Sequence, residues 1–154
     1  MNEPRVHRHA SGENGIFANA YLVEMAGGIV AVDATLTETD SKALRTKIES
    51  LGKPLRAVLI THGHPDHYNG VTNLVAEDSV PIAATAGVDR VIRENDAAKE
   101  KQWRPVFKQE WPARRTFPNR IVRDRESLSF GDMTFTVHDL GPGESHTWSG
   151  LPRP

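Results

Sequence analysis

The segment Thr61–His67 (THGHPDH) is the most informative part of the chain. It holds three of the seven histidines, with a carboxylate among them. Imidazole and carboxylate groups together are ligands that zinc, iron and copper take in proteins, whereas calcium and magnesium prefer oxygen donors. The segment therefore predicts a site for a divalent transition metal.

The spacing within this segment indicates how the donors are arranged. His62 and His64 are two residues apart, so in extended chain their side chains point the same way and can bind one ion. Gly63 between them lets the backbone turn tightly. Pro65 suits the first position of a helix, which would direct the next two residues toward a second, adjacent point. The spacing predicts half of a two-metal site.

The flanking sequence distinguishes this interpretation from a solvated histidine loop, a purification tag or a core histidine. Leu55 to Ile60 (LRAVLI) is typical of a strand with both faces covered. Val71, Leu74 and Val75 then recur at helical spacing. A tag has no such setting, so the flanks favour the metal site.

The pattern His62-x-His64-x-Asp66-His67 after an apolar strand resembles the metal-binding signature of the metallo-β-lactamase-fold hydrolases. The resemblance implies an α/β (α+β) fold, a sandwich of two sheets flanked by helices (αββα). It implies that His62 and His64 join a later histidine around one zinc ion, while Asp66 and His67 hold a second ion. It also gives Asp66 a catalytic role, in which its carboxylate orients or deprotonates the attacking water.

Two histidines compete for the position of the later ligand. His138 lies on the Thr134/Thr136 face of an expected strand, where an exposed or hydrogen-bonded histidine is the ordinary outcome. His146 follows the glycine-rich turn Gly141–Ser145 (GPGES). The third motif of the family is also a histidine after a short Gly-Pro-Gly-like turn, so the resemblance favours His146.

The other segments predict layered packing of helices on a sheet. Asp33 ends the second expected strand, where an ordinary polar residue is the simplest interpretation; the resemblance implies instead that it supports the metal loop. The elements that the patterns predict are a hairpin of Gly15–Glu24 and Gly28–Val32, a helix begun by the capping box Thr37-x-x-Asp40, a helix from Val71 to about Asp78, a strand at Val80–Thr85, a helix at Gly87–Trp103 and a hairpin at Leu128–Val137.

Lys99 to Arg125 is the most basic part of the chain, with nine Lys and Arg residues against three Asp and Glu. This excess could steer an anionic substrate or meet an acidic partner. Solvated loop charge is the favoured alternative. Trp103, Trp111 and three prolines interleave with the charges. The prolines indicate an irregular flap over or beside a site.

The composition limits the class of protein. A chain of 154 residues suits one domain with a real core, and a net charge of -1 gives no drive toward nucleic acid or a membrane surface. No apolar run is long enough to span a membrane, and Met1–Ser11 lacks the hydrophobic middle of a signal peptide, so we expect a cytoplasmic protein. With no cysteine, the chain has no disulfide, thiolate ligand or cysteine nucleophile.

The resemblance covers the N-terminal part of the family's fold. In the family, the C-terminal half supplies further strands, a bridging Asp and a last His. Thr147–Pro154 (TWSGLPRP) is predicted to be a poor strand and has no imidazole or carboxylate side chain. We therefore expect residues 1–154 to be a single metallo-β-lactamase-like domain truncated after the third metal motif. The alternative is a half-domain completed by another chain, which leaves a homo-oligomer open.

The resemblance implies zinc-dependent hydrolysis of a small molecule. One or two zinc ions lower the pKa of bound water, so that hydroxide attacks an ester, thioester, lactone, amide or phosphoester bond. A mononuclear iron oxygenase of the same superfamily is one alternative. A non-catalytic metal-binding fragment or half-domain is an alternative of another class.

Overall fold

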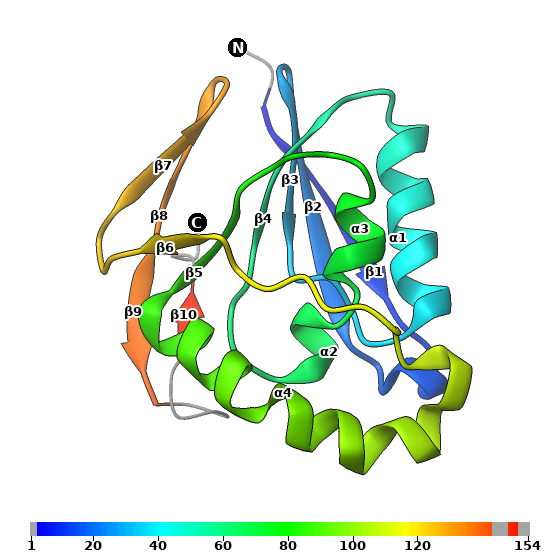
Figure 1. The fold of residues 1–154 in the computed structure, drawn as a ribbon. Coiled ribbons are helices and arrows are strands. Elements are labelled where there is room, and N and C mark those ends of the chain that lie inside the picture. Colours follow the sequence, from blue (N-terminus) through cyan, green and yellow to red (C-terminus); the bar gives the residue numbers. More distant parts are fainter. Residues whose placement is uncertain (1–2, 143–147, 151–154) are drawn as a thin grey trace.

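A six-stranded sheet forms the centre of the computed structural model, which describes residues 3–142 and 148–150 (Figure 1). Its strands follow one another in chain order, from β1 to β6. The first three pair antiparallel, whereas β3, β4, β5 and β6 pair in parallel. The strands are β1 (Arg5–Ala10), β2 (Asn19–Met25), β3 (Gly28–Val32), β4 (Leu55–Leu59), β5 (Ile82–Thr85) and β6 (Arg120–Val122).

All four α-helices of the described chain cover one face of this sheet. Their buried side chains, among them Leu44, Tyr68, Leu74 and Ile92, belong to a single core with the residues of that face. Parallel neighbours need such crossover helices, because a tight turn cannot join them. The helices are α1 (Glu38–Ser50), α2 (Pro65–Tyr68), α3 (Val71–Val75) and α4 (Ala86–Phe107), and two 3₁₀ turns are η1 (Glu13–Gly15) and η2 (Lys108–Glu110).

A hairpin of β7 (Ser127–Phe130) and β8 (Met133–Thr136) covers the other face of the sheet. Leu128 and Phe135 form a second core with side chains of β2, β3 and β4. Because both faces are covered, all five residues of β3 are buried. The layers of helices, sheet and second sheet confirm the predicted α/β fold class.

Two helices begin at the residues that the sequence predicts. Thr37 caps α1: its hydroxyl oxygen accepts the amide of Asp40 at 3.1 Å and its hydroxyl donates to the Asp40 carboxylate at 2.8 Å. Pro65 occupies the first position of α2. Other boundaries shift, since β2 begins at Asn19 rather than Gly15 and α3 ends at Val75.

The helix expected at Gly87–Trp103 is confirmed but is longer, so the flap expected from Lys99 onward is wrong over its first third. Residues 99–107 belong to α4, which runs through Pro105 to Phe107. Pro105 lies near the end of the helix, where the loss of one backbone hydrogen bond is tolerated more easily than in the interior. The irregular segment 111–119 packs against the helices, with hydrogen bonds from Arg115 to Asp96 and between Thr72 and Thr116.

The expectation of a poor strand after His146 is also wrong in part. Trp148–Gly150 forms β10, which pairs antiparallel with β9 (His138–Gly141). The pairing is irregular between Trp148 and Ser149. A strand this short needs only three residues in extended conformation, which a single glycine and two later prolines do not prevent.

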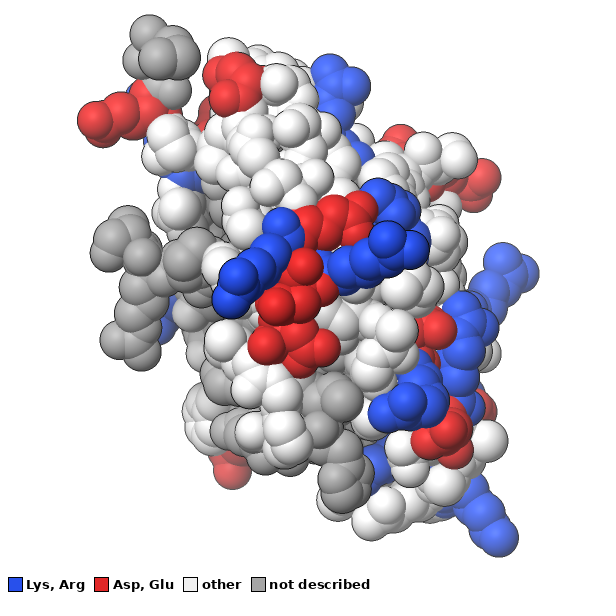
Figure 2. Space-filling view, turned by 90° about the vertical axis from the view of Figure 1, so that its left-hand side faces the viewer, with Lys and Arg blue, Asp and Glu red and all other residues white. Residues whose placement is uncertain are grey.

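The charges of the basic segment are partly paired. Asp96 and Glu126, which lie outside residues 99–125, bind Arg115 and Arg120, and Glu100 binds Arg104. On the side that carries the β7–β8 hairpin, Figure 2 shows basic and acidic side chains next to each other rather than a surface of one sign. Within the described residues, no helix combines the length and the apolar character needed to cross a membrane.

Candidate metal centre

The candidate centre lies where the carboxyl ends of β3 and β4 meet. Asp33 follows β3, while Thr61 and His62 follow β4. Because the two strands are parallel neighbours, their carboxyl ends lie at the same edge of the sheet. The short helix α2 begins immediately after this edge, and Figure 1 shows it beneath the ends of the strands.

Three histidine rings of the metal loop, residues 61–67, lie side by side. The ring centroids of His62 and His67 are 3.8 Å apart, and those of His62 and His64 are 4.9 Å apart. His62 is buried, with 5% of its surface exposed, whereas His64 and His67 are partly exposed. The structure thus brings together donors that the sequence separates by a glycine, a proline and an aspartate.

Asp33 connects the two strand ends. Its Oδ1 accepts the backbone amide of Thr61 at 2.9 Å, and its Oδ2 accepts the Thr61 hydroxyl at 2.7 Å. The same Oδ2 lies 2.7 Å from Nδ1 of His67. Asp33 is 4% exposed and has a left-handed backbone, with φ of 64°. Its carboxylate therefore orients His67, as the resemblance implies for an acidic residue at this strand end.

Asp66 contacts the other nitrogen of the same ring, with Oδ2 3.1 Å from Nε2 of His67. Burial lowers the pKa of His67, but the hydrogen bonds to Asp33 and Asp66 outweigh it and raise that pKa to about 10. Burial raises the pKa of Asp66, but the hydrogen bond from His67 outweighs it and leaves the pKa below its usual value. His67 is therefore a cation between two carboxylates at neutral pH.

His62 has the opposite electrostatic environment. Burial, and then the positive charge of His67, lower its pKa to about 4. Its imidazole is therefore neutral at pH 7, the form in which histidine binds metals. Nδ1 of His62 lies 3.1 Å from the Thr61 hydroxyl oxygen.

Gly63 has a different role from the tight turn that the sequence predicts. Its φ lies outside the left-handed range, so the backbone conformation does not require glycine. A Cβ atom at this position would lie 2.7 Å from Cγ1 and 3.1 Å from Cβ of Val91 on α4. Glycine is needed because the metal loop passes this close to the helix.

His146, which the resemblance favours as the third ligand, lies outside the described residues. Its competitor His138 is the first residue of β9 and is partly buried. Among the residues that are described, no group of three or more His, Asp and Glu side chains has the arrangement of a metal site.

The chemistry of the donor set nevertheless fits zinc. Three imidazoles and a carboxylate suit a borderline divalent ion, and Asp33 supplies the carboxylate that commonly orients a metal-binding histidine through its other nitrogen. The side chains whose chemistry fits are His62, His64, Asp66 and His67.

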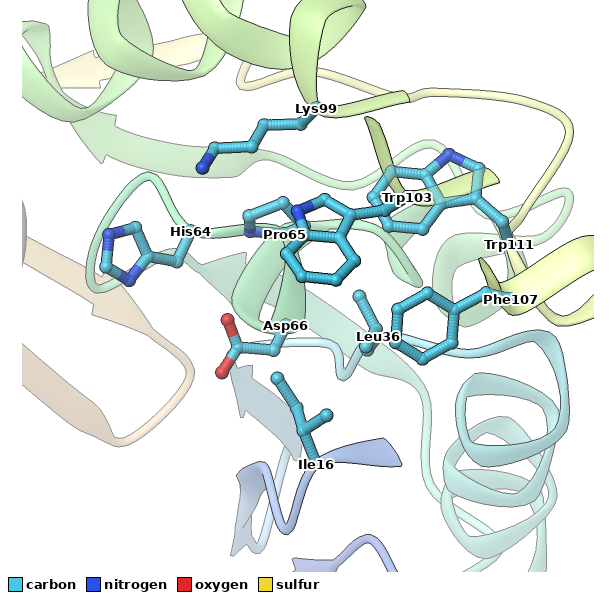
Figure 3. A pocket seen from close by; sticks show the side chains of 9 residues that line it. All are labelled: Ile16, Leu36, His64, Pro65, Asp66, Lys99, Trp103, Phe107 and Trp111. Atoms are coloured by element: carbon cyan, nitrogen blue, oxygen red, sulfur yellow. The ribbon is translucent and has the colours of Figure 1, made fainter. Parts of the chain in front are cut away.

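The sequence does not indicate the role of Thr61, and it predicts a flap with Trp103 and Trp111 over or beside a site but no cleft. Thr61 joins Asp33 to the metal loop through both its amide and its hydroxyl, yet nothing in its local pattern indicates this. Trp103, Phe107 and Trp111 line a cleft that His64 and Asp66 also line (Figure 3). Trp103 and Phe107 are four residues apart, one turn of α4, and this spacing could have indicated their shared face, whereas Trp111 lies beyond the end of the helix.

A family model described as the metallo-beta-lactamase superfamily matches residues 14–150. Among the described elements, the match includes the nine strands from β2 to β10, the four α-helices and the whole metal loop. It therefore covers both the central layers and the candidate site.

Two curated proteins share part of the sequence. A hydroxyacylglutathione hydrolase from Alkalilimnicola ehrlichii is 36% identical over 86 residues, which are 53% of this chain and 34% of that protein. A linear primary-alkylsulfatase from a Pseudomonas species is 33% identical over 60 residues, which are 38% of this chain and 11% of that protein. The chain thus spans only a minor part of the length of these relatives.

Solved structures share the fold at low sequence identity. A metallo-beta-lactamase from Pontibacter korlensis superposes with a TM-score of 0.71 at 17% identity, over 95% of this chain and 60% of that one. The metallo-beta-lactamase MIM-1 from Novosphingobium pentaromativorans superposes with a TM-score of 0.64 at 23% identity, over 87% of this chain and 48% of that one. At these identities the likeness shows the fold alone.

Proposed function

Because the chain belongs to the metallo-β-lactamase superfamily, we propose that it is part of a zinc-dependent hydrolase that acts on a small molecule. The cluster of His62, His64 and His67 beside Asp66 and Asp33 carries the proposal, since these side chains meet at the carboxyl ends of two parallel strands. Two relatives that share part of the sequence also have the names of hydrolytic enzymes.

We assign His62, His64 and, by resemblance, His146 to one ion, and Asp66 and His67 to a second. Zinc is the proposed metal, and iron is the alternative that the same donors accept. We further propose that residues 1–154 form one domain, which the two cores on opposite faces of a single sheet support.

The chain's own residues prepare this site for hydrolysis of an ester, thioester, lactone, amide or phosphoester bond. When bound, zinc supplies a Lewis acid and lowers the pKa of a water molecule to near neutrality. Asp66 is ionised at neutral pH, so its carboxylate can orient the attacking water or accept its proton. Asp33 keeps Nδ1 of His67 occupied, which leaves Nε2 toward Asp66. Metal binding through Asp66 and His67 requires the hydrogen bond between them to break and His67 to release the proton on Nε2, because histidine binds metals in its neutral form.

Metal analysis tests the proposal directly. The purified chain, loaded with zinc and dialysed extensively, is expected to retain one ion more tightly than a second, because the second site has only Asp66 and His67 on this chain. His62→Ala is expected to lose the retained ion, since the substitution removes a buried, neutral imidazole. Mass spectrometry of the metal content gives the measurement.

His7→Ala is the matched control for the loss of a histidine. His7 is on β1 and binds Glu24, so its substitution is expected to leave the metal content unchanged. Retention of zinc by His62→Ala at the level of the unsubstituted chain would contradict the ligand assignment. Two ions held with equal strength would contradict the unequal sites.

The third ligand can be tested by a pair of variants. His146→Ala is expected to weaken zinc binding, whereas His138→Ala is expected to leave it unchanged, because only His146 follows the glycine-rich turn typical of the family's third motif. Titration of each metal-free variant with zinc against a chromogenic chelator gives the affinities. The reverse order of effects would assign the position to His138.

A non-catalytic metal-binding fragment or half-domain is the second candidate function. The observation that favours it is the small share of the relatives that the chain matches, which is 34% of the hydroxyacylglutathione hydrolase and 11% of the alkylsulfatase. Hydrolysis of a generic ester or lactam by the zinc-loaded chain, abolished in His62→Ala, would exclude this candidate. Bound iron with an oxygen-dependent reaction would instead support the oxygenase alternative.

A further inference from the structure

An apolar cleft of about 210 Å³ opens beside the metal loop (Figure 3). His64 and Asp66 line one end of it. Three aromatic side chains, Trp103 and Phe107 from α4 and Trp111 after η2, line the other end. The cleft therefore joins the candidate metal ligands to an aromatic wall.

The aromatic wall is continuous. The ring centroids of Trp103 and Phe107 are 6.2 Å apart and those of Phe107 and Trp111 are 6.0 Å apart, which are distances for aromatic contact. Trp111 is 1% exposed and forms the base, whereas Trp103 is 36% exposed. An apolar cavity of about 150 Å³ is large enough to bind benzene. This cleft is thus large enough for a substituted aromatic ring.

Among the described residues that line the cleft, Lys99 is the only lysine or arginine. It lies one helical turn before Trp103 on the same face of α4, and Figure 3 shows its ammonium group extended over the cleft on the side of His64. Within the described part of the chain, Lys99 forms no ion pair. The carboxylate on the facing wall, Asp66, is bound to His67. The cleft thus offers a positive charge to an anionic group at the edge of an apolar surface.

We propose that this cleft binds a substrate that carries both an aromatic group and an anionic group. The aromatic group packs against Trp103, Phe107 and Trp111, the anionic group pairs with Lys99, and the bond to be hydrolysed lies toward His64 and Asp66. The placement of the hydrolysed bond near His64 and Asp66 rests on the proposed function, whereas binding of the substrate in the cleft needs no metal. The inference therefore names a substrate class and a specificity-determining residue, Lys99.

Isothermal titration calorimetry of the metal-free chain tests the inference. The probes are 2-naphthoate, its neutral analogue 2-naphthalenemethanol, and acetate as the anion without a ring. Lys99→Met keeps most of the apolar stem and removes the charge, so it is expected to weaken naphthoate binding about fivefold and leave naphthalenemethanol binding unchanged. Trp103→Ala is expected to weaken both aromatic probes about tenfold.

Lys101→Met is the matched control, because Lys101 is an exposed lysine of the same helix outside the cleft. It is expected to bind all probes as the unsubstituted chain does. Equal naphthoate affinity of Lys99→Met and the unsubstituted chain would overturn the inference, as would acetate binding as tight as naphthoate binding.

The metal analysis separates this inference from the proposed function. A chain that retains zinc through His62 but does not bind naphthoate would overturn the cleft inference alone. A chain that binds naphthoate through Lys99 but retains no zinc would overturn the proposed function alone and support the cleft as a binding site.

Discussion

Asp96→Ala is expected to lower the free energy of unfolding by about 3 to 5 kcal/mol, the usual cost of removing one partner from a buried ion pair. Asp96 is 7% exposed and lies on α4. Its Oδ1 accepts the Tyr68 hydroxyl at 2.8 Å and Nε of Arg115 at 2.9 Å. A globular domain is typically stable by only about 5 to 15 kcal/mol, so this loss is a large fraction of the total.

The cost arises from the groups that remain after the substitution. The Arg115 side chain is 9% exposed and packs over the Trp111 ring, with its guanidinium carbon 5.0 Å from the ring centroid. Without Asp96, its charge would lose its buried counter-ion, and the buried Tyr68 hydroxyl would lose its acceptor. The network also joins three separate segments, because Tyr68 is in α2, Asp96 in α4 and Arg115 in the irregular segment 111–119.

Chemical denaturation at neutral pH measures the effect. Glu94→Ala is the matched control, because Glu94 is an exposed acidic residue two positions away on the same helix. It is expected to change the free energy of unfolding by less than about 0.5 kcal/mol. Tyr68→Phe removes one hydroxyl and leaves the Asp96–Arg115 pair, so it is expected to cost about 1 kcal/mol. If Asp96→Ala lowers the free energy of unfolding no more than Glu94→Ala does, the hydrogen bonds of Asp96 with Tyr68 and Arg115 do not stabilise the fold.

Asp33→Asn is expected to have the second largest effect, on both zinc affinity and stability. Asparagine adopts positive φ values readily, so it can occupy the left-handed backbone at this position. Its amide keeps an acceptor for the Thr61 amide but turns an NH₂ group toward Thr61 Oγ1 and His67 Nδ1. Loss of the charged hydrogen bonds is expected to cost about 1.5 to 3 kcal/mol.

The affinity for the second zinc ion, which we assign to Asp66 and His67, is expected to fall about 10- to 100-fold in Asp33→Asn, as is typical when the group that orients a metal-binding histidine is lost. Chelator competition measures the affinity, and thermal unfolding measures the stability of the same sample. Asp132→Asn, in the exposed turn between β7 and β8, is the matched control and should change neither quantity. Unchanged zinc affinity in a folded Asp33→Asn variant would show that Asp33 does not support the site.

Elements whose signals act over a few residues could be predicted from the sequence. The Thr37 capping box, Pro65 at the start of α2 and the turn at Gly131 and Asp132 each depend on neighbours in the chain, and each is observed. The buried run at β4 and the family pattern of the metal loop also identified the fold class. Lengths were less predictable, because α4 continues through Pro105, where sequence alone favours a break.

The environment of individual charges could not be predicted in the same way. Arg115 was expected to be one of several solvated charges, yet it is buried against Asp96, 19 residues earlier. Lys99 belongs to the same basic segment but lines the cleft with no ion pair among the described residues. Arg115 and Lys99, two basic residues of one segment, thus differ in role because packing places them on different surfaces.

Local sequence was sufficient to predict the layered α/β class and the closeness of the histidine rings of the metal loop, since spacing of two residues, helix caps and apolar runs all act through short-range backbone geometry. The three-dimensional arrangement alone established that Asp33 reaches Thr61 and His67, 28 and 34 residues away. It alone placed the aromatic side chains of α4 beside His64 and Asp66. The physical reason is that these contacts form only when parallel pairing of β3 with β4 and burial of the helices bring distant segments together.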